Sequence, residues 1–267
     1  MVMTIKEVYD SYKKFIVAIY IYIEEEMVGS GTGFLLSSGH LITNFHIFEN
    51  LLINLNNGKN CKVKLVFNEI AVEIHNEDIK KIRTEYCSME NNNDYIILNI
   101  SGHVNKECYE SACLCFADEE PVVGQRCCIL GYPFGKNRLS IHECMVSSIY
   151  RKCEINVYQL DGSVNTGNSG GPLVDVATGR IIGIVSRKEN GLNELFNELK
   201  QAMKKNCEIM QGLSDYHIAI GGFDAVQAIR ASLDNINALI PHIERSANVG
   251  IGYAFEIKQI KKDISLV

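Results

Sequence analysis

The chain has 267 residues, which suits one large domain or a pair of lobes. Hydrophobic residues make up 46% of it and charged residues 22%, as in ordinary soluble globular proteins. The formal net charge of −6 argues against nucleic acid as the main partner, because phosphate binding needs clustered Lys and Arg side chains.

The predicted elements begin with a short helix over residues 4–14 and continue as a series of short strands. The first strand, 15–23, is the longest apolar run, and it is far shorter than the roughly 20 residues that span a bilayer. Three glutamates follow it where a signal peptide would carry small residues, so we expect a cytoplasmic protein without membrane association. Further strands are predicted at 31–37, 40–43, 51–55, 62–67, 95–99, 126–131, 143–149, 173–174 and 181–186.

Turn residues separate these strands, and Asn56-Asn57-Gly58 predicts a hairpin turn. Short strands with such turns favour antiparallel barrels or a sandwich over a doubly wound sheet. Residues 189–247 break the pattern, because they contain two apolar helical faces, and Pro241 is expected to end or kink the second helix. Strand-like sequence resumes at 249–257, so the sequence predicts a helical hairpin inserted into a β domain.

The chain contains ten cysteines, and no two of them have the CxxC spacing of common zinc sites. Without a secretion signal we expect free thiols that are mostly buried, and no metal. Cys127 and Cys128 are predicted to point to opposite faces of one strand, whereas Cys113 and Cys115 share a face.

The segment from Asn165 to Leu173, NTGNSGGPL, is the most informative in the sequence. A serine between glycines suits a nucleophile, because glycines adopt unusual backbone angles and let a substrate carbonyl approach the main chain. Successive N–H groups in such a turn can converge on an oxyanion. Ser169 is therefore the candidate nucleophile.

A nucleophilic serine needs a base, and the base needs an orienting group. His46 follows a short apolar strand, and Asp94 precedes the buried strand 95–99. Alone, each residue reads as an ordinary strand-end or turn residue. Together they give the order His, Asp, Ser with separations of 48 and 75 residues, which is one of the known triad orders.

These segments resemble the trypsin-like serine peptidases, and most of all the protease domain of the HtrA/Deg group and its stand-alone bacterial relatives. The resemblance rests on seven segments in consistent order, namely Gly31–Phe34, Leu41–His46, Asp94–Leu98, Gly131–Gly135, Gln159–Leu173, Gly183–Ser186 and Gly250–Ala254. We expect no PDZ domain after the last strand. Thr166 departs from the proline that is common at this place in the HtrA pattern.

The resemblance implies an all-β, chymotrypsin-like fold of two antiparallel barrels. The N-terminal lobe would span 1–116 and carry His46 and Asp94, and the C-terminal lobe would span 117–267, carry Ser169 and hold the insertion at about 189–247. It further implies acyl transfer without a cofactor, with His46 as general base, Asp94 as its orienting partner and the N–H groups of Gly167 and Ser169 as the oxyanion hole.

The same match implies a cleft for a protein or peptide substrate, lined by Ser163, Ser186, Arg187, Lys188 and Gly252. Ser163 at the pocket floor carries no charge, so we expect a small, apolar or polar residue before the cleaved bond rather than Arg or Lys. Arg187 and Lys188 leave open a preference for a nearby acidic side chain. The helical insertion follows the cleft-lining strand closely, so it is a candidate for gating access or for docking a regulatory protein.

Two other functions compete with this interpretation. An α/β-hydrolase would also use a GxSxG serine, but that family places its aspartate and histidine after the serine and needs alternating helices and parallel strands. The other alternative is a catalytically silent binding or regulatory module on the trypsin fold, which usually lacks a triad residue. A variant of the peptidase interpretation is a protease that is inactive until an activator or a partner binds.

Overall fold

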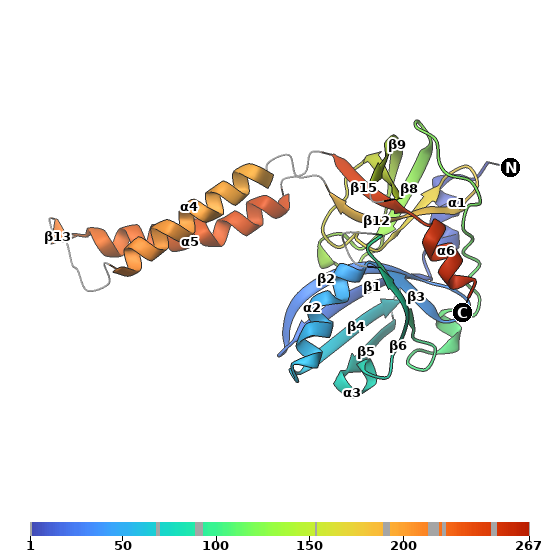
Figure 1. The fold of residues 1–267 in the computed structure, drawn as a ribbon, viewed down its shortest axis with the longest axis horizontal. Coiled ribbons are helices and arrows are strands. Elements are labelled where there is room, and N and C mark those ends of the chain that lie inside the picture. The colour runs from blue at the N-terminus through green and yellow to red at the C-terminus, as the bar shows by residue number, and fades with distance from the viewer. Residues whose placement is uncertain are drawn as a thin grey trace. The chain divides into compact units, whose positions relative to one another are not determined.

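The apolar run near the N-terminus forms an interior strand of the first lobe, with a neighbouring strand on each side (Figure 1). The computed structural model describes residues 2–67, 70–88, 93–152, 154–188, 193–212, 219–220, 223–246 and 250–266. Its residues group into two units, one of residues 1–189 and 250–267, and one of residues 190–249. The first unit holds two β lobes, and the second holds a helical hairpin.

The first lobe is a seven-stranded antiparallel sheet with the order β5-β4-β1-β2-β3-β7-β6. In chain order its strands and helices are β1 (Ile16–Ile23), β2 (Glu26–Leu35), β3 (His40–Thr43), α2 (Phe45–Asn56), β4 (Cys61–Phe67), β5 (Ile70–His75), α3 (Asn76–Ile79), β6 (Arg83–Ser88) and β7 (Tyr95–Asn99).

Strand β1 is apolar throughout because both of its faces are buried. Its odd-numbered residues, such as Val17 and Ile19, pack in the core of the first lobe. Its even-numbered residues, such as Ile16 and Ala18, pack in a second core that the two lobes share. This alternation follows from the two-residue period of a strand, and it places β1 between the core of the first lobe and the core that the lobes share.

The second lobe is a closed antiparallel barrel with the order β10-β15-β12-β11-β8-β9. Its strands are β8 (Arg126–Gly131), β9 (Ser140–Lys152), β10 (Ile155–Asp161), β11 (Pro172–Asp175), β12 (Ile181–Lys188) and β15 (Ile251–Glu256). Short 3₁₀ turns at Lys106–Cys108 and Pro133–Gly135 connect elements in the lobes. The expected all-β, chymotrypsin-like architecture is confirmed, but only the second lobe is a closed barrel. The first lobe, for which a barrel was also expected, is a sheet because its edge strands β5 and β6 do not pair with each other among the described residues. Phe116, at the expected lobe boundary, forms an isolated bridge with Ile181 of the second lobe.

Terminal helices α1 (Ile5–Tyr12) and α6 (Lys258–Ile264) tie the lobes together (Figure 1). Helix α1 starts with a capping box between Thr4 and Glu7, and it contributes Val8 and Tyr12 to the core that the lobes share. In α6, the buried carboxylate of Asp263 accepts a hydrogen bond from the hydroxyl of Tyr95, the first residue of β7. The C-terminal helix is thereby bonded to the residue after Asp94.

The second unit contains α4 (Asn193–Gly212), the two-residue strands β13 (Ala219–Ile220) and β14 (Phe223–Asp224), and α5 (Ala225–Ser246). The helices pack along a seam in which Phe196 and Met203 of α4 face Ile240 and Leu233 of α5. A second row on α5 stays exposed, with Ile229, Ile236 and Ile243 each between 43% and 54% accessible. The predicted hairpin is confirmed, but α5 continues through Pro241 to Ser246.

Two local predictions were wrong. Residues 51–55 belong to helix α2 and not to a strand, because Ile47, Phe48, Leu51 and Leu55 bury one face at helical spacing. Asn56-Asn57-Gly58 is accordingly the C-terminal end of α2 and the turn into β4, and not a strand-to-strand hairpin.

Among the helices of the described residues, none has the length and apolar character required to cross a membrane.

The described cysteines are free thiols, and Cys153 lies outside the described residues. Cys127 and Cys128 pack in different cores, so they point to opposite faces of β8 as predicted. Burial raises the pKa of each of these two thiols to about 12.

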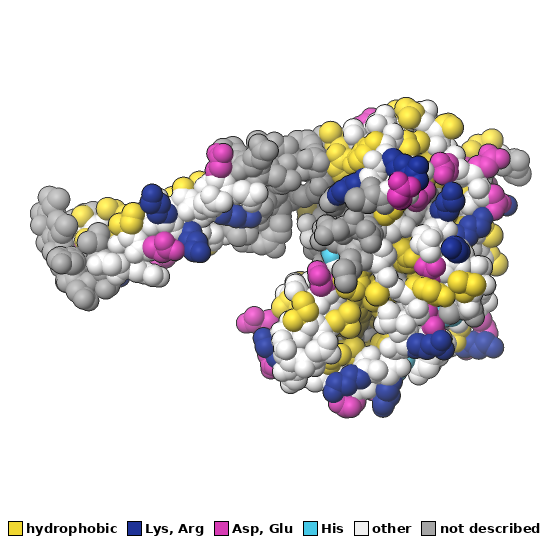
Figure 2. Space-filling view, viewed as in Figure 1, with side chains coloured by type: hydrophobic (Ala, Val, Ile, Leu, Met, Phe, Trp, Pro, Cys, Tyr) yellow, Lys and Arg dark blue, Asp and Glu magenta, His cyan; other side chains and the backbone are white. Residues whose placement is uncertain are grey.

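On the face drawn in Figure 2, acidic and basic side chains are interspersed over the two-lobed unit.

Candidate active site

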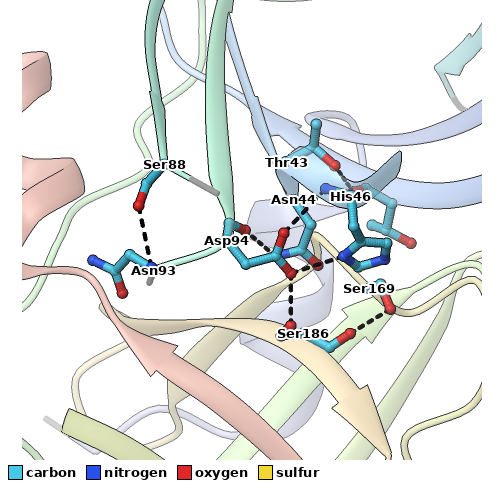
Figure 3. A network of polar contacts seen from close by, with 9 residues as sticks. Thr43, Asn44, His46, Ser88, Asn93, Asp94, Ser169 and Ser186 are labelled. Carbon is cyan, nitrogen blue, oxygen red and sulfur yellow. Dashed lines mark hydrogen bonds and ion pairs between the residues drawn. The ribbon is translucent and has the colours of Figure 1, made fainter. Parts of the chain in front are cut away.

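His46, Asp94 and Ser169 meet where the two lobes face each other (Figure 3). His46 lies in the first turn of α2, directly after β3, and Asp94 immediately precedes β7. Ser169 lies in the turn before β11 of the second lobe. The structure therefore brings together three residues that are far apart in the sequence.

The Asp94 carboxylate is fully buried and accepts three hydrogen bonds. One oxygen, Oδ2, accepts from His46 Nδ1 at 2.7 Å and from the Ser186 hydroxyl at 2.8 Å. The other, Oδ1, accepts from the backbone N–H of His46 at 3.0 Å. Because an ionised carboxylate can only accept, the proton of the neutral imidazole is assigned to Nδ1, and this tautomer has its lone pair on Nε2.

The same carboxylate explains the start of helix α2. The first N–H groups of a helix have no acceptor within the helix, and the positive end of its dipole favours a negative charge. Asn44 is the N-cap, but its side-chain amide donates to the Asp94 carbonyl at 2.7 Å and caps nothing. Asp94 takes over the capping role through the N–H of His46, which fixes the main chain and the ring of the histidine to one carboxylate.

Ser186 reaches Asp94 because strand β12 is irregular at this residue. The pairing of β12 with β15 shifts register between Val185 and Arg187, which leaves Ser186 at a bulge. Bulges re-aim side chains and are frequent next to active sites. The sequence predicted Ser186 as a substrate-binding residue, whereas its side chain is 3% exposed and bonded to Asp94.

The Ser169 hydroxyl donates to the backbone carbonyl of Ser186 at 2.6 Å. A hydroxyl has one proton, so this bond and a bond to the imidazole exclude each other. Rotation about the Cα–Cβ bond exchanges one for the other, and the lost neutral hydrogen bond costs about 1 kcal/mol.

The turn before Ser169 presents two N–H groups that have no acceptor. Those of Gly167 and Ser169 donate to no atom of the residues that the structure describes. The N–H groups around them are occupied, since Asn168 donates to Asn165, Gly170 to Val185 and Gly171 to Asn168. Free, neighbouring N–H groups of a turn can hold an anion.

Both peptide groups that flank Gly167 are held in place. The Thr166 carbonyl accepts from the N–H of Phe134 at 2.6 Å, and the Gly167 carbonyl accepts from the Thr32 hydroxyl at 2.6 Å. Carbonyl and N–H point in opposite directions in a trans peptide, so the bond to Phe134 turns the N–H of Gly167 away from that side. Gly167 has φ of 99°, and a Cβ there would lie 2.3 Å from the Tyr132 carbonyl oxygen.

The remaining predicted residues belong to the second lobe. Ser163 is exposed, and Gly252 of β15 is buried against Val164. A Cβ on Gly252 would lie 2.2 Å from a methyl group of Val164, so the space between them is narrow. The backbone of Arg187 and Lys188 pairs with Tyr253 and Gly252, and their side chains lie outside the described part of the structure.

Three residues of the site were missed by the sequence reasoning. Thr32 and Asn44 hold the backbone around the triad, and Val164 narrows the space beside Gly252. Each of them lies in a segment that carried the resemblance, namely Gly31–Phe34, Leu41–His46 and Gln159–Leu173, so a signal was present, but nothing distinguished these three residues from their neighbours. Among the described residues no group of three or more His, Cys, Asp and Glu side chains is placed to hold a metal ion.

The chain is similar in sequence to known serine proteases. The chain is 30% identical over 172 residues to a probable periplasmic serine endoprotease, DegP-like, of Halomonas elongata, with 61% of this chain and 30% of that protein covered. It is 30% identical over 186 residues to the chloroplastic protease Do-like 5 of Arabidopsis thaliana, with 63% and 52% covered. The chain thus spans about a third and about half of the length of these relatives.

Solved structures show the same fold. The crystal structure of Deg5 has a TM-score of 0.52 at 25% identity and covers 68% of this chain and 83% of its own. The HtrA-type protease AlgW with tripeptide has a TM-score of 0.57 at 16% identity, covering 98% and 62%. The profile of the trypsin-like peptidase domain matches residues 31–184, which is more than half of the chain, and the chain therefore belongs to the trypsin-like peptidase family.

Proposed function

We propose that the chain is a serine endopeptidase that cleaves protein or peptide substrates through an acyl-enzyme intermediate. The observation that carries the proposal is the buried Asp94 carboxylate, which holds His46 through Nδ1 and through its backbone N–H. Beside it, the turn of Ser169 presents two N–H groups that have no acceptor among the described residues. The family membership and the two serine-protease relatives support it.

In this mechanism His46 Nε2 takes the proton of Ser169 as its oxygen attacks the substrate carbonyl carbon. The carbonyl oxygen becomes negative and is stabilised by the N–H groups of Gly167 and Ser169. Asp94 holds the ring and stabilises the imidazolium that forms, and the imidazolium then protonates the leaving amine. In the second half of the reaction, His46 acts again as the base and water attacks the acyl-enzyme. Neither half of the reaction requires a cofactor.

The serine must first leave the Ser186 carbonyl. We infer that substrate binding to the strand edge at Ser186 releases the hydroxyl, and that the resting chain is less reactive for this reason. The same bond favours a second candidate, a trypsin-fold module that stays silent until a partner or activator binds. A silent module would retain the bond when substrate is present.

The narrow space between Val164 and Gly252 and the uncharged Ser163 support a preference for a small residue before the cleaved bond. A peptide library varied at that position tests this preference. We expect cleavage after Ala, Val, Ser or Thr, with the products identified by mass spectrometry. Fast cleavage after Arg or Lys alone would refute the proposed pocket without refuting the triad.

A regulatory protein docking on residues 189–247 is the accompanying proposal. The exposed row of Ile229, Ile236 and Ile243 on α5 supports it, because a repeat of seven residues suits a second helix. The nine free thiols among the described residues support a reducing, cytoplasmic location. If a chain without residues 190–249 cleaves its physiological substrate at an unchanged rate, the docking proposal is contradicted.

A further inference from the structure

A cavity of about 610 Å³ lies at the turn that starts at Gly135, and none of its lining residues belongs to strand β12. Its walls come from β1, β2 and β4 of the first lobe and from the turn 135–138 of the second lobe. The side chains that matter are two tyrosines, a methionine and three cations, namely Tyr20, Tyr22, Met27, Lys64, Lys136 and Arg138.

The cavity is connected to the nucleophile by two short pieces of backbone. The turn begins at Phe134, whose N–H is bonded to Thr166, and a Cβ on Gly167 would lie 3.1 Å from the amide nitrogen of Gly135. On the other wall, β2 runs from Met27 to Gly31, where a Cβ would lie 3.2 Å from the Ser169 carbonyl oxygen. Four residues of strand cover about 13 Å.

This geometry fixes which part of a substrate reaches the cavity. The residues before the cleaved bond are proposed to lie along Ser186 and Gly252, on the opposite side of Ser169. An extended chain that leaves Ser169 toward the cavity advances about 3.3 Å per residue. The cavity therefore receives side chains about two to four residues after the cleaved bond.

The side chains that line the cavity carry three positive charges, of which one is paired. Among the described residues Lys64 has the carboxylate of Glu73 as its partner, at 3.7 Å. Lys136 and Arg138 are exposed and form no ion pair with any residue that the structure describes. The lining contains no carboxylate, although the chain as a whole has a net charge of −6. The carboxylate of Glu25, at the nearby β1–β2 turn, lies 3.7 Å from Lys62.

The turn that carries these cations is held by a side chain of the first lobe. The buried Tyr20 donates its hydroxyl hydrogen bond to Asn137 Oδ1 at 2.5 Å, and Asn137 lies between Lys136 and Arg138. This hydrogen bond therefore holds the backbone between Lys136 and Arg138 against the first lobe. Tyr22 and Met27 add apolar surface, and Met27 is 56% exposed.

We propose that this cavity binds an acidic side chain of the substrate, two to four residues after the cleaved bond. Lys136 and Arg138 are the residues that determine this preference, and Tyr22 and Met27 pack against the stem of the bound side chain. The inference rests on the proposed function, because it takes its direction from the cleavage at Ser169.

The test measures binding without catalysis. The peptide is labelled with fluorescein and carries alanine before the bond and aspartate at the second, third and fourth positions after it. We titrate it with the Ser169→Ala chain and follow its fluorescence anisotropy. The control peptide carries asparagine at the same three positions. Two exposed ion pairs predict about 3- to 10-fold tighter binding of the acidic peptide. The preference disappears in about 1 M NaCl, where charges are screened beyond about 3 Å.

The variant K136Q/R138Q loses the preference, and the matched variant K6Q/K152Q, which removes two exposed cations outside the cavity, retains it. Equal affinity for both peptides, binding too weak to measure for both, or an equal loss in the two variants overturns the inference. Labelling of the unmodified chain by a fluorophosphonate separates the two proposals. A labelled chain without acidic preference refutes the cavity alone, and an unlabelled chain that retains the preference refutes the peptidase alone.

Discussion

Thr32 holds the turn that presents the two free N–H groups, and replacing it by valine tests whether that turn matters. The side chain is fully buried; its hydroxyl donates to the Gly167 carbonyl at 2.6 Å and accepts from the N–H of Tyr132 at 3.0 Å. Valine keeps the branched shape and removes both bonds. Each buried group left without a partner costs about 1–3 kcal/mol, so we expect the free energy of unfolding to fall by about 3 kcal/mol.

The effect on catalysis follows from the same bonds. If the Gly167 N–H loses its alignment, part of the roughly 3–4 kcal/mol that one oxyanion donor supplies is lost. We expect Thr32→Val to lower kcat by about 10- to 100-fold with KM little changed, because the oxyanion exists only in the transition state. Steady-state kinetics on a cleaved peptide, together with urea unfolding, measures both effects.

Thr32→Ser is the control, because serine keeps the hydroxyl. We expect its kcat to stay within about threefold of that of the original chain. The reasoning is refuted if Thr32→Val keeps the original kcat, or if serine and valine lower it equally. The second outcome would mean that any change of the side chain at this position disturbs the site, and that the hydroxyl bonds are not the specific cause.

Three further predictions concern buried polar groups. Ser186→Ala removes one of three donors to the Asp94 carboxylate, and we expect urea unfolding to show a loss of about 1.5–3 kcal/mol, with kcat also reduced; unchanged stability would contradict this. The pKa values of Cys127 and Cys128, raised from 9.0 to about 12, predict that stability is full below pH 9 and falls as pH rises from about 9 to about 12, a loss that alanine at both positions should reduce. Asp263→Ala leaves the buried tyrosine hydroxyl of β7 without its acceptor, so the urea midpoint should fall, whereas Asp263→Asn should restore most of it; equal midpoints for the two variants would argue against the bond.

The strands could be predicted where burial is one-sided or complete over five or more residues, as in β1, β7 and β8. Helix α2 could not, because its LLINL segment looks like a strand when read without Ile47 and Phe48 before it. Strands β5, β6 and β10 were missed. Most side chains of β5 and β6 are exposed or half-buried, which leaves no apolar alternation to detect, whereas β10 alternates only over its second half.

The chemistry-bearing residues could be found from the sequence because they stand in short, ordered motifs. The partners that position them could not, since each depends on a contact across the fold. Ser186 turns to Asp94 only through a bulge in β12, and Thr32 meets Gly167 across 135 residues. The cationic cavity likewise combines Lys64 of one lobe with Lys136 and Arg138 of the other, and no local pattern connects them.

The central claim is that Ser169 is a nucleophile activated by His46. The most direct measurement is labelling of the folded chain with a fluorophosphonate, beside Ser169→Ala and His46→Ala, with the modified residue located by mass spectrometry. We predict one adduct, on Ser169. It is absent from Ser169→Ala, and in His46→Ala it forms much more slowly. A folded chain that takes up no label, or an adduct that persists when Ser169 is alanine, would contradict it.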